Sequence, residues 1–479
     1  MDFIGFTIIA IYFVCLLAIG YYFSHRQQNL SDFFLAGHSI PTWAALAAVV
    51  ATETSAVTYI GAPASSFLED FSFLQFAFGF VLARFILAAF FLPRFFEHEI
   101  VTIYQYLGRQ FGNKTQRVGG IFFFITRALA AGVRHYAAAL VISSITRIDI
   151  TTAILITGLI SLFYSMLGGL SAVIWTEVFQ FAIMIIGSLL AFFYLLFLTP
   201  GGWEQIVTFA SEHNKFTLIH WDWSGREVSY TLFIGILGGL CTSLATHGAD
   251  QDTVQRLLSC RNLRSAQTAI IGSGIVVFLQ FTFYLTIGVM LFTFYQGTLP
   301  NGVQKADELF TFFISNNLPS AAAALVIAAI LSAALSSTAS ALNSLSSTSV
   351  NDFFLVLTKK PADEKTLVRY SRIFTFLWTC ILMLIAIWAQ NSSNILNTGY
   401  RIPGYTYGSL LAAFLLGIFT PVRSEFAIIT GMLAGVVLVL ILSFLGFPLI
   451  WFVPTGALTA ILIAFLLDFF RRNQTSAEP

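Results

Sequence analysis

A line of serine hydroxyls runs through a long apolar segment near residue 340. Five serines recur there at or close to four-residue spacing: Ser332, Ser336, Ser340, Ser344 and Ser347. No Pro or Gly interrupts the segment, so it is predicted to be one continuous helix with the hydroxyls on one face. Hydroxyl and carbonyl oxygens suit a small hard cation such as Na⁺. Small residues also let membrane helices pack closely, so from this segment alone close packing remains an alternative interpretation.

A second polar stretch, Ala51-Thr-Glu-Thr-Ser55, lies in the middle of another apolar segment. Gly61 and Pro63 follow it, and this pattern predicts a helix that unwinds within the membrane. A carboxylate such as Glu53 costs about 2.5–3.5 kcal/mol at that depth, so a role in function is favoured. The alternative is that Glu53 is buried in a pair with an arginine.

Three arginines in apolar segments are available for such a pair: Arg84, Arg127 and Arg134. An arginine that faces a central cavity would also bind a carboxylate well, because its planar fork donates two parallel hydrogen bonds. Arg134 therefore indicates a substrate with a carboxylate. If Glu53 is also free, a zwitterion such as an amino acid fits as well.

The composition places these residues in a membrane protein. The 479 residues are 57% hydrophobic and 10% charged, whereas soluble domains carry about 25% charged residues. A net charge of +1 gives no indication of nucleic-acid binding. The seven histidines form no metal-spaced pair, no Ser-His-carboxylate grouping is evident, and no signalling domain is attached. An enzyme and a membrane sensor are therefore disfavoured, and we expect no obligate protein partner.

Apolar stretches long enough to cross a bilayer predict an all-α integral membrane protein with about 13 spans. Their approximate bounds are 3–23, 40–66, 71–96, 118–145, 149–169, 172–199, 228–256, 265–295, 319–355, 368–390, 395–420, 423–444 and 448–470. Lys and Arg gather in alternate loops, which predicts a plasma or inner membrane protein with an external N-terminus and a cytoplasmic C-terminus. Gly238-Gly239 and Pro403-Gly404 are expected to weaken or break their helices.

Five stretches, in order along the chain, resemble the sodium/solute symporter family, which includes carriers of sialic acid, proline, galactose and pantothenate. They are Ala51-Thr-Glu-Thr-Ser55, Gly168-Gly-Leu…Ile174-Trp-Thr-Glu177, Asp250-Gln-Asp-Thr-Val-Gln-Arg256, Ser336-Ser…Ser340-Ala-Leu-Asn-Ser344 and Tyr405-Thr-Tyr-Gly-Ser-Leu-Leu411. The resemblance covers nearly the whole chain and implies one LeuT-like transporter domain, 1–479. Its parts would be an extra helix at 3–23, inverted five-helix repeats at 40–199 and 228–420, and two C-terminal helices at 423–470.

The resemblance also implies a principal sodium site between the segments 40–66 and 319–355. Its ligands would be the carbonyls of Ala51, Thr54, Ala333 and Ser336, with the hydroxyl of Ser337. Some family members have a second sodium site, to which Glu177 and Ser340 would correspond here. Glu177 replaces an aspartate of those members, and Ala339 replaces one of their hydroxyls. We therefore expect one sodium ion per cycle.

Substrate residues follow from the same resemblance. Positions that match the pocket of the sialic acid carriers are Glu53, Ser55, Thr58, Phe73 and Arg134; Ser243 and His247 match the sugar carriers, and Gln75 is close in sequence. Glu53 replaces a threonine of the sialic acid carriers, whereas proline carriers have an aspartate there, so the substrate stays open. We expect a Na⁺-coupled symporter that imports a small anionic or zwitterionic solute by alternating access. The alternatives are a neutral sugar as substrate, or proton coupling through Glu53 or Glu177.

Overall fold

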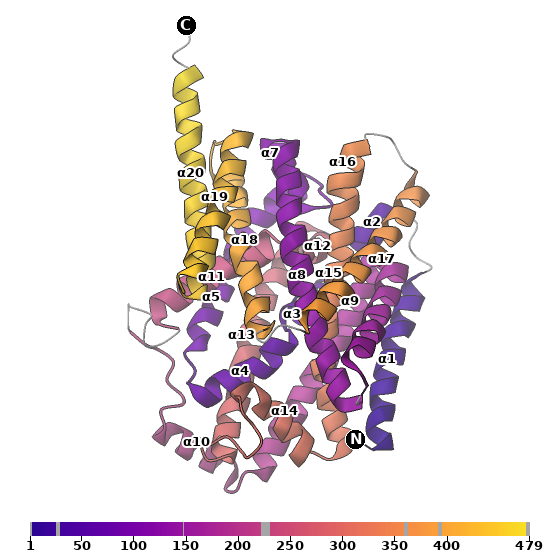
Figure 1. Ribbon diagram of the computed structural model, residues 1–479, viewed down its shortest axis with the longest axis vertical. Helices are drawn as coiled ribbons and strands as arrows, with labels where there is room; N and C mark the ends of the chain where they lie inside the picture. The colour runs from indigo at the N-terminus through magenta and orange to yellow at the C-terminus, as the bar shows by residue number, and fades with distance from the viewer. Residues whose placement is uncertain are drawn as a thin grey trace.

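The computed structural model describes residues 2–24, 29–146, 148–221, 230–358, 363–390 and 395–475. Within these ranges the chain is a bundle of helices without a named β-strand (Figure 1). The two ends of the chain lie at opposite ends of the bundle, with α7 and α16 near the C-terminal end and α10 and α14 near the other (Figure 1). The predicted all-α architecture is confirmed for the described part of the chain.

The helices have the following bounds in chain order: α1 Phe3–Ser24, α2 Leu30–Leu35, α3 Thr42–Glu53, α4 Ala56–Leu68, α5 Phe73–Ile86, α6 Leu92–Glu97, α7 Ile103–Phe111, α8 Asn113–Thr146, α9 Ile150–Leu198, α10 Gly202–Glu212, α11 Leu232–Gly248, α12 Gln251–Leu258, α13 Leu263–Phe294, α14 Ala306–Asn317, α15 Ser320–Thr348, α16 Leu355–Thr358, α17 Glu364–Ala389, α18 Ile395–Phe419, α19 Glu425–Phe444 and α20 Phe452–Thr475. Short 3-10 or π-helical turns lie at Ala36–His38, Leu87–Phe91, Ser349–Phe354 and Leu449–Trp451.

Nine helices of the described chain are long and apolar enough to cross a membrane, or up to eleven if each of two bent pairs forms one span. The predicted span 149–169 coincides with an apolar helix, Ile150–Met166, that is shorter than these. The count of about 13 spans therefore stays a prediction.

Two of the predicted spans are broken by a bend, and the two bends have nearly the same angle. α3 and α4 are bent by 61°, and α11 and α12 by 62°. The first break lies at Thr54 and Ser55, whose backbones are extended, as the polar stretch around Glu53 predicts. Each bent pair is the first helix of one predicted repeat. The repeat bounds themselves remain predictions.

The expected weak point at Gly238 and Gly239 is wrong, because α11 runs unbroken from Leu232 to Gly248. The glycines instead let α11 lie directly against α5. A Cβ on Gly239 would come within 2.0 Å of the Phe76 carbonyl oxygen, and a Cβ on Gly79 within 2.3 Å of the Ile236 carbonyl oxygen. The bend lies farther along the chain, between Gly248 and Gln251.

Two other expected breaks have different outcomes. The boundary predicted near Gly168 and Gly169 is present, because Gly169 has φ 54° and ψ −152° and interrupts α9 there. The break expected at Pro403-Gly404 is wrong, since α18 continues from Ile395 to Phe419 with Pro403 inside it. Neighbouring membrane helices can compensate for the backbone hydrogen bond that a proline removes.

The serine-rich helix α15 lies inside the bundle and not against lipid. Every residue from Val326 to Thr348 is buried. α15 packs against α9, α8 and α1 along much of its length. The line of serines therefore faces other helices, where hydroxyls can find partners within the protein.

A loop on the predicted external side holds the far end of α4. The Lys215 Nζ donates hydrogen bonds to the carbonyls of Phe67 and Glu69, at 2.7 and 2.8 Å. Burial lowers the pKa of Lys215, and the negative charges of Asp70 and Glu69 act in the opposite direction. A second tie joins His220 Nε2 to Asp70 Oδ2 at 2.6 Å. These contacts satisfy carbonyls at the end of α4 that lack helical partners.

Candidate sodium and substrate site

Three of the five residues predicted as sodium ligands, Ala51, Ala333 and Ser336, meet where α3 ends beside the middle of α15. The Ser336 Oγ donates to the Ala51 carbonyl at 3.0 Å and lies 3.3 Å from the Ala333 carbonyl. The Ala51 carbonyl is open to this contact because α3 stops two residues later, so no helical N–H reaches it. Thr54 is 2% exposed, and Ala51 and Ser336 are fully buried. The structure thus brings backbone oxygens of a broken helix against hydroxyls of α15.

Other hydroxyls of α15 bond back to their own helix. Ser337 donates to the Ala334 carbonyl at 3.0 Å, and Ser332 donates to the Ala328 carbonyl at 2.8 Å. Such contacts are the usual resting arrangement of a helical serine, and they cost little to exchange for another oxygen-binding partner. The assignment of Ser337 as a sodium ligand remains a prediction.

An arginine occupies the region predicted for a second sodium ion. Arg256 Nε and Nη2 donate to the two Glu177 carboxylate oxygens at 2.9 and 2.5 Å. The same Nη2 group also contacts the Ser340 hydroxyl, which in turn contacts Asp252. Glu177 and Arg256 are each 1% exposed. Both predicted ligands of the second site are therefore engaged by a guanidinium, which already supplies a positive charge there.

This pair belongs to a larger buried network that spans several helices. Its charged members, all buried, are Glu177 on α9, Arg127 on α8, and Asp250, Asp252 and Arg256 at or within α12. The Tyr407 hydroxyl of α18 donates to Asp250. The network ties α12, the shorter helix of a broken span, to four helices around it: α8, α9, α15 and α18.

The network was not predicted from the sequence, although the sequence contains a signal for one of its ion pairs. Asp252 and Arg256 are four residues apart on α12 and form an ion pair at 3.1 Å. A carboxylate and an arginine one turn apart inside an apolar segment are a signal for a buried ion pair. The distant residues that join this ion pair could be identified only from the folded structure.

Glu53 is paired with Arg84. Arg84 Nη2 lies 2.7 Å from Glu53 Oε2, and the Arg84 side chain is fully buried while that of Glu53 is 14% exposed. His247 Nε2 lies 3.4 Å from the same carboxylate oxygen. The alternative that Glu53 is buried in a pair with an arginine is therefore present in the structure. Its carboxylate is engaged from α5 and α11 at once.

Ser55 and Thr58, two further predicted substrate residues, lie directly after the break in the first span. Ser55 and Thr58 hydroxyls are 3.2 Å apart at the start of α4. Ser243, on α11, is 1% exposed, and its hydroxyl has no partner among the described residues. Arg134 is half-buried on α8 and lies within electrostatic reach of Tyr407.

Phe73 and Gln75 face a different neighbourhood, at the start of α5. The Phe73 ring contacts those of Tyr230 and Phe281, and the Gln75 amide donates to the Tyr230 carbonyl at 2.8 Å. Gln280 on α13 was not predicted, yet it accepts a hydrogen bond from Thr54 at 2.8 Å. A glutamine in the middle of an apolar helix was the sequence signal for it.

Comparison with known proteins decides the class of this site. A sequence model of the sodium:solute symporter family matches residues 33–435. The chain belongs to this family. It is therefore a multi-pass Na⁺-coupled symporter for a small solute and not an enzyme, as predicted. The predicted LeuT-like fold is confirmed as well.

Several family members resemble this symporter over most of their length. It is 27% identical to the sodium/sialic acid symporter of Proteus mirabilis, across 91% of this chain and 89% of that one. It is 28% identical to the mouse sodium-coupled monocarboxylate transporter 1, across 87% and 69%. A solved structure of a substrate-bound, outward-open Na⁺-coupled sialic acid symporter superimposes with a TM-score of 0.90 at 26% identity and covers 98% of both chains. The nucleobase-cation symporter Mhp1, at 15% identity and a TM-score of 0.62, shares the fold.

Proposed function

We propose that this symporter couples one Na⁺ to the uptake of a small solute that carries a carboxylate, across a plasma or inner membrane. The contact between the Ser336 hydroxyl and the Ala51 carbonyl carries this proposal, because it places the end of α3 beside the hydroxyls of α15. In the proposed topology the N-terminus is external and the C-terminus cytoplasmic, as the Lys and Arg distribution predicts.

Sodium would act by holding the break in the first span. A cation between Ala51, Thr54, Ala333, Ser336 and Ser337 would replace weak hydroxyl contacts with ion–oxygen contacts to both α3 and α15. The unwound residues Thr54 and Ser55 would then be fixed next to the predicted substrate residues. Because coupling between two sites is reciprocal, bound solute would raise the affinity for Na⁺ by the same factor.

Replacement of both Ser336 and Ser337 by alanine should raise the Na⁺ concentration for half-maximal uptake by at least about tenfold. Even outer contacts of a metal site change affinity about 10–100-fold, and these are proposed direct ligands. The measurement is solute uptake into proteoliposomes over a range of Na⁺ concentrations. Ser332→Ala is the matched control, since Ser332 is buried on the same helix, is not among the proposed ligands, and bonds to the Ala328 carbonyl and to Tyr12. An unchanged Na⁺ dependence in the double variant would exclude this sodium site.

A single sodium ion is proposed because Arg256 already binds Glu177 and Ser340. Dual-isotope flux should give about one Na⁺ per solute and a Hill coefficient near one. If the solute is a monoanion, the loaded carrier moves no net charge. Uptake should then be insensitive to membrane potential, which otherwise contributes about 2.3 kcal/mol per charge per 100 mV. A ratio of two with an inward current would show that a second cation displaces the arginine.

The carboxylate is proposed from Arg134 and from the relatives. The planar guanidinium of Arg134 can donate two parallel hydrogen bonds to a carboxylate. Relatives carry sialic acid or monocarboxylates. A thermal-shift screen of carboxylates, zwitterions and neutral sugars, each with and without Na⁺, would identify the class, because a ligand stabilises the state that it binds. Stabilisation by neutral sugars alone would favour the sugar-carrier alternative.

A further inference from the structure

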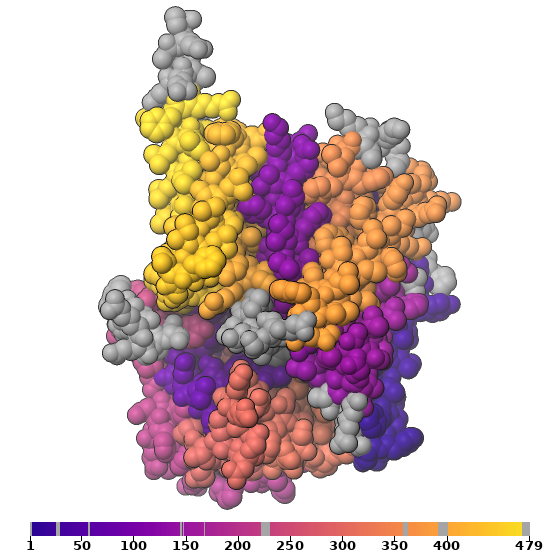
Figure 2. All heavy atoms as spheres, viewed as in Figure 1, coloured from indigo at the N-terminus to yellow at the C-terminus, as the bar shows by residue number. Residues whose placement is uncertain are grey.

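A pocket with a charged rim lies between α8, α19 and α20. It is at the start of α8, far along that helix from the predicted substrate residue Arg134, and α19 and α20 carry no predicted sodium or substrate residue. Its volume is about 830 Å³, within the range of about 300–1,000 Å³ that small-molecule sites occupy. Three basic residues line it, each from a different part of the chain: Lys114, Arg423 and Arg471. In the space-filling view, the purple surface of α8 is flanked by the orange and yellow surfaces of the C-terminal helices at this end of the molecule (Figure 2). We call this feature the basic pocket.

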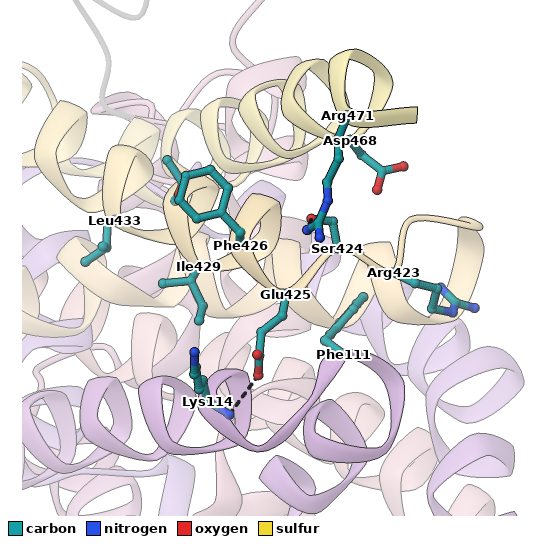
Figure 3. Close-up of a pocket in the computed structure, with 11 residues that line it drawn as sticks. Phe111, Lys114, Arg423, Ser424, Glu425, Phe426, Ile429, Leu433, Asp468 and Arg471 are labelled. Atoms are coloured by element: carbon teal, nitrogen blue, oxygen red, sulfur yellow. Dashed lines mark hydrogen bonds between the residues drawn. The ribbon is translucent and has the colours of Figure 1, made fainter. Parts of the chain in front are cut away.

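The basic side chains are more accessible than the acidic ones in this pocket. Lys114, Arg423 and Arg471 are exposed, whereas Asp468 is 7% exposed. The Glu425 carboxylate accepts the backbone N–H groups of Lys114 and Thr115, at 2.8 and 3.2 Å, so it caps the start of α8 (Figure 3). The rim therefore offers positive charge outward, while the negative charges are turned to the protein.

Two of the basic groups keep hydrogen-bonding capacity. The Lys114 ammonium makes no ion pair within the described parts of the chain. Arg423 uses Nη1 for the carbonyls of Thr420 and Val422, at 2.8 and 2.6 Å, which fixes the guanidinium and leaves its other nitrogens directed elsewhere. A fixed guanidinium beside an ammonium is a suitable receptor for a phosphate group.

An apolar stripe leads away from the rim along α19. Phe426 is 64% exposed and Leu433 is 50% exposed, and Ile429 lies between them on the pocket wall. Phe426 and Leu433 are seven residues apart, so they lie on one face of the helix about 10 Å from each other along its axis. A charged rim continuous with an exposed apolar stripe on a membrane helix matches a molecule with an anionic head and a hydrocarbon tail.

We propose that the basic pocket binds the phosphate headgroup of an anionic phospholipid, with an acyl chain along Phe426, Ile429 and Leu433. The pocket lies on the side where Lys and Arg gather, which is the predicted cytoplasmic face. Anionic lipids are concentrated in that leaflet and attract basic residues by about 1 kcal/mol each, or roughly fivefold in affinity. The lipid would bridge the start of α8 to α19 and α20, which are the two C-terminal helices that follow the predicted repeats.

A second pocket provides a contrast within the same protein. It has a volume of about 1000 Å³ and lies between α1, α2 and α9, with Tyr22, Phe23 and Trp175 in its wall. Among the described residues that line it there is no lysine or arginine. It lacks the groups that would distinguish an anionic headgroup from a neutral one.

The test uses the full chain in nanodiscs of phosphatidylcholine, into which phosphatidylglycerol is titrated while thermal stability is measured. Lys114→Gln with Arg423→Gln should weaken the phosphatidylglycerol effect about 25-fold, since each basic group contributes about fivefold. Arg261→Gln with Arg264→Gln is the matched control, because both residues are exposed on the same predicted face and the charge change is equal. Equal losses in the two double variants would overturn the proposal and indicate diffuse surface attraction. No loss in the first would also overturn it.

Two further arms test the apolar stripe and the source of the phosphate. Leu433→Trp should reduce the stabilisation by filling the stripe without changing charge, whereas Leu384→Trp, exposed on α17 and outside the pocket, should not. Inorganic phosphate alone should neither stabilise the carrier nor compete with the lipid. Full competition by inorganic phosphate would overturn the proposal and assign the pocket to a soluble anion.

Discussion

Glu53→Gln should destabilise the folded symporter by about 3–5 kcal/mol, because it leaves the Arg84 guanidinium charged and without its carboxylate in the protein interior. Arg84 is fully buried and lies 2.7 Å from Glu53. The neighbouring His247 cannot replace the lost negative charge. The loss should be visible as a lower thermal midpoint in detergent and a smaller folded fraction after extraction from the membrane.

The double variant Glu53→Gln with Arg84→Met should recover most of this stability, since it removes both charges together. Glu97→Gln is the control, because its pair with Arg94 at 3.3 Å is exposed on both sides and such pairs contribute about 0–1 kcal/mol. If Glu53→Gln remains fully stable and fails only in transport of amino acids, Glu53 serves the substrate and the zwitterion interpretation is correct.

Arg134→Lys should weaken binding of the solute by about thirtyfold or more, because a point charge does not reproduce the two parallel bonds of a guanidinium. The loss of a buried charged contact costs about 2–5 kcal/mol. Arg134→Ala should abolish carboxylate uptake and still permit stabilisation of the empty carrier by Na⁺, which binds elsewhere in the proposal. Solute binding and Na⁺-dependent thermal shift separate these two effects.

Arg117→Lys provides the control for this substitution. Arg117 lies on the same helix, α8, and its Nε donates only to the Asn113 carbonyl at 3.2 Å. The Arg117→Lys variant should therefore bind solute with the affinity of the wild type. Transport of an uncharged sugar at wild-type affinity by Arg134→Ala would contradict a carboxylate substrate.

The sequence was sufficient for features that depend on local pattern. Polar residues in an apolar segment predicted the break at Thr54 and Ser55, and the lack of Pro and Gly predicted an unbroken α15. The family resemblance correctly predicted the fold and the class of transporter. Each of these depends on residue type and on neighbours within a few turns.

Features that depend on distant partners were not predictable in the same way. Glu177 and Arg256 are 79 residues apart, and nothing in this spacing identifies them as partners. Gly238 and Gly239 illustrate the opposite error, because glycine weakens an isolated helix but here it permits direct contact with α5. Pro403 was misjudged for the same reason, since its surroundings compensate for the bond that it removes.

The close contact of α5 with α11 has a mechanical consequence. With only hydrogen atoms between Gly79, Gly239 and the facing backbones, the two helices have no soft layer of side chains that could shear. They form a stiff beam whose α11 member has 17 residues, a length of about 25 Å. A force applied to one end of this helix pair would therefore reach the other end with little loss. That end is the bend before Gln251, so a force applied near Leu232 arrives as torque on α12 and on the ion pairs of Asp252 and Arg256.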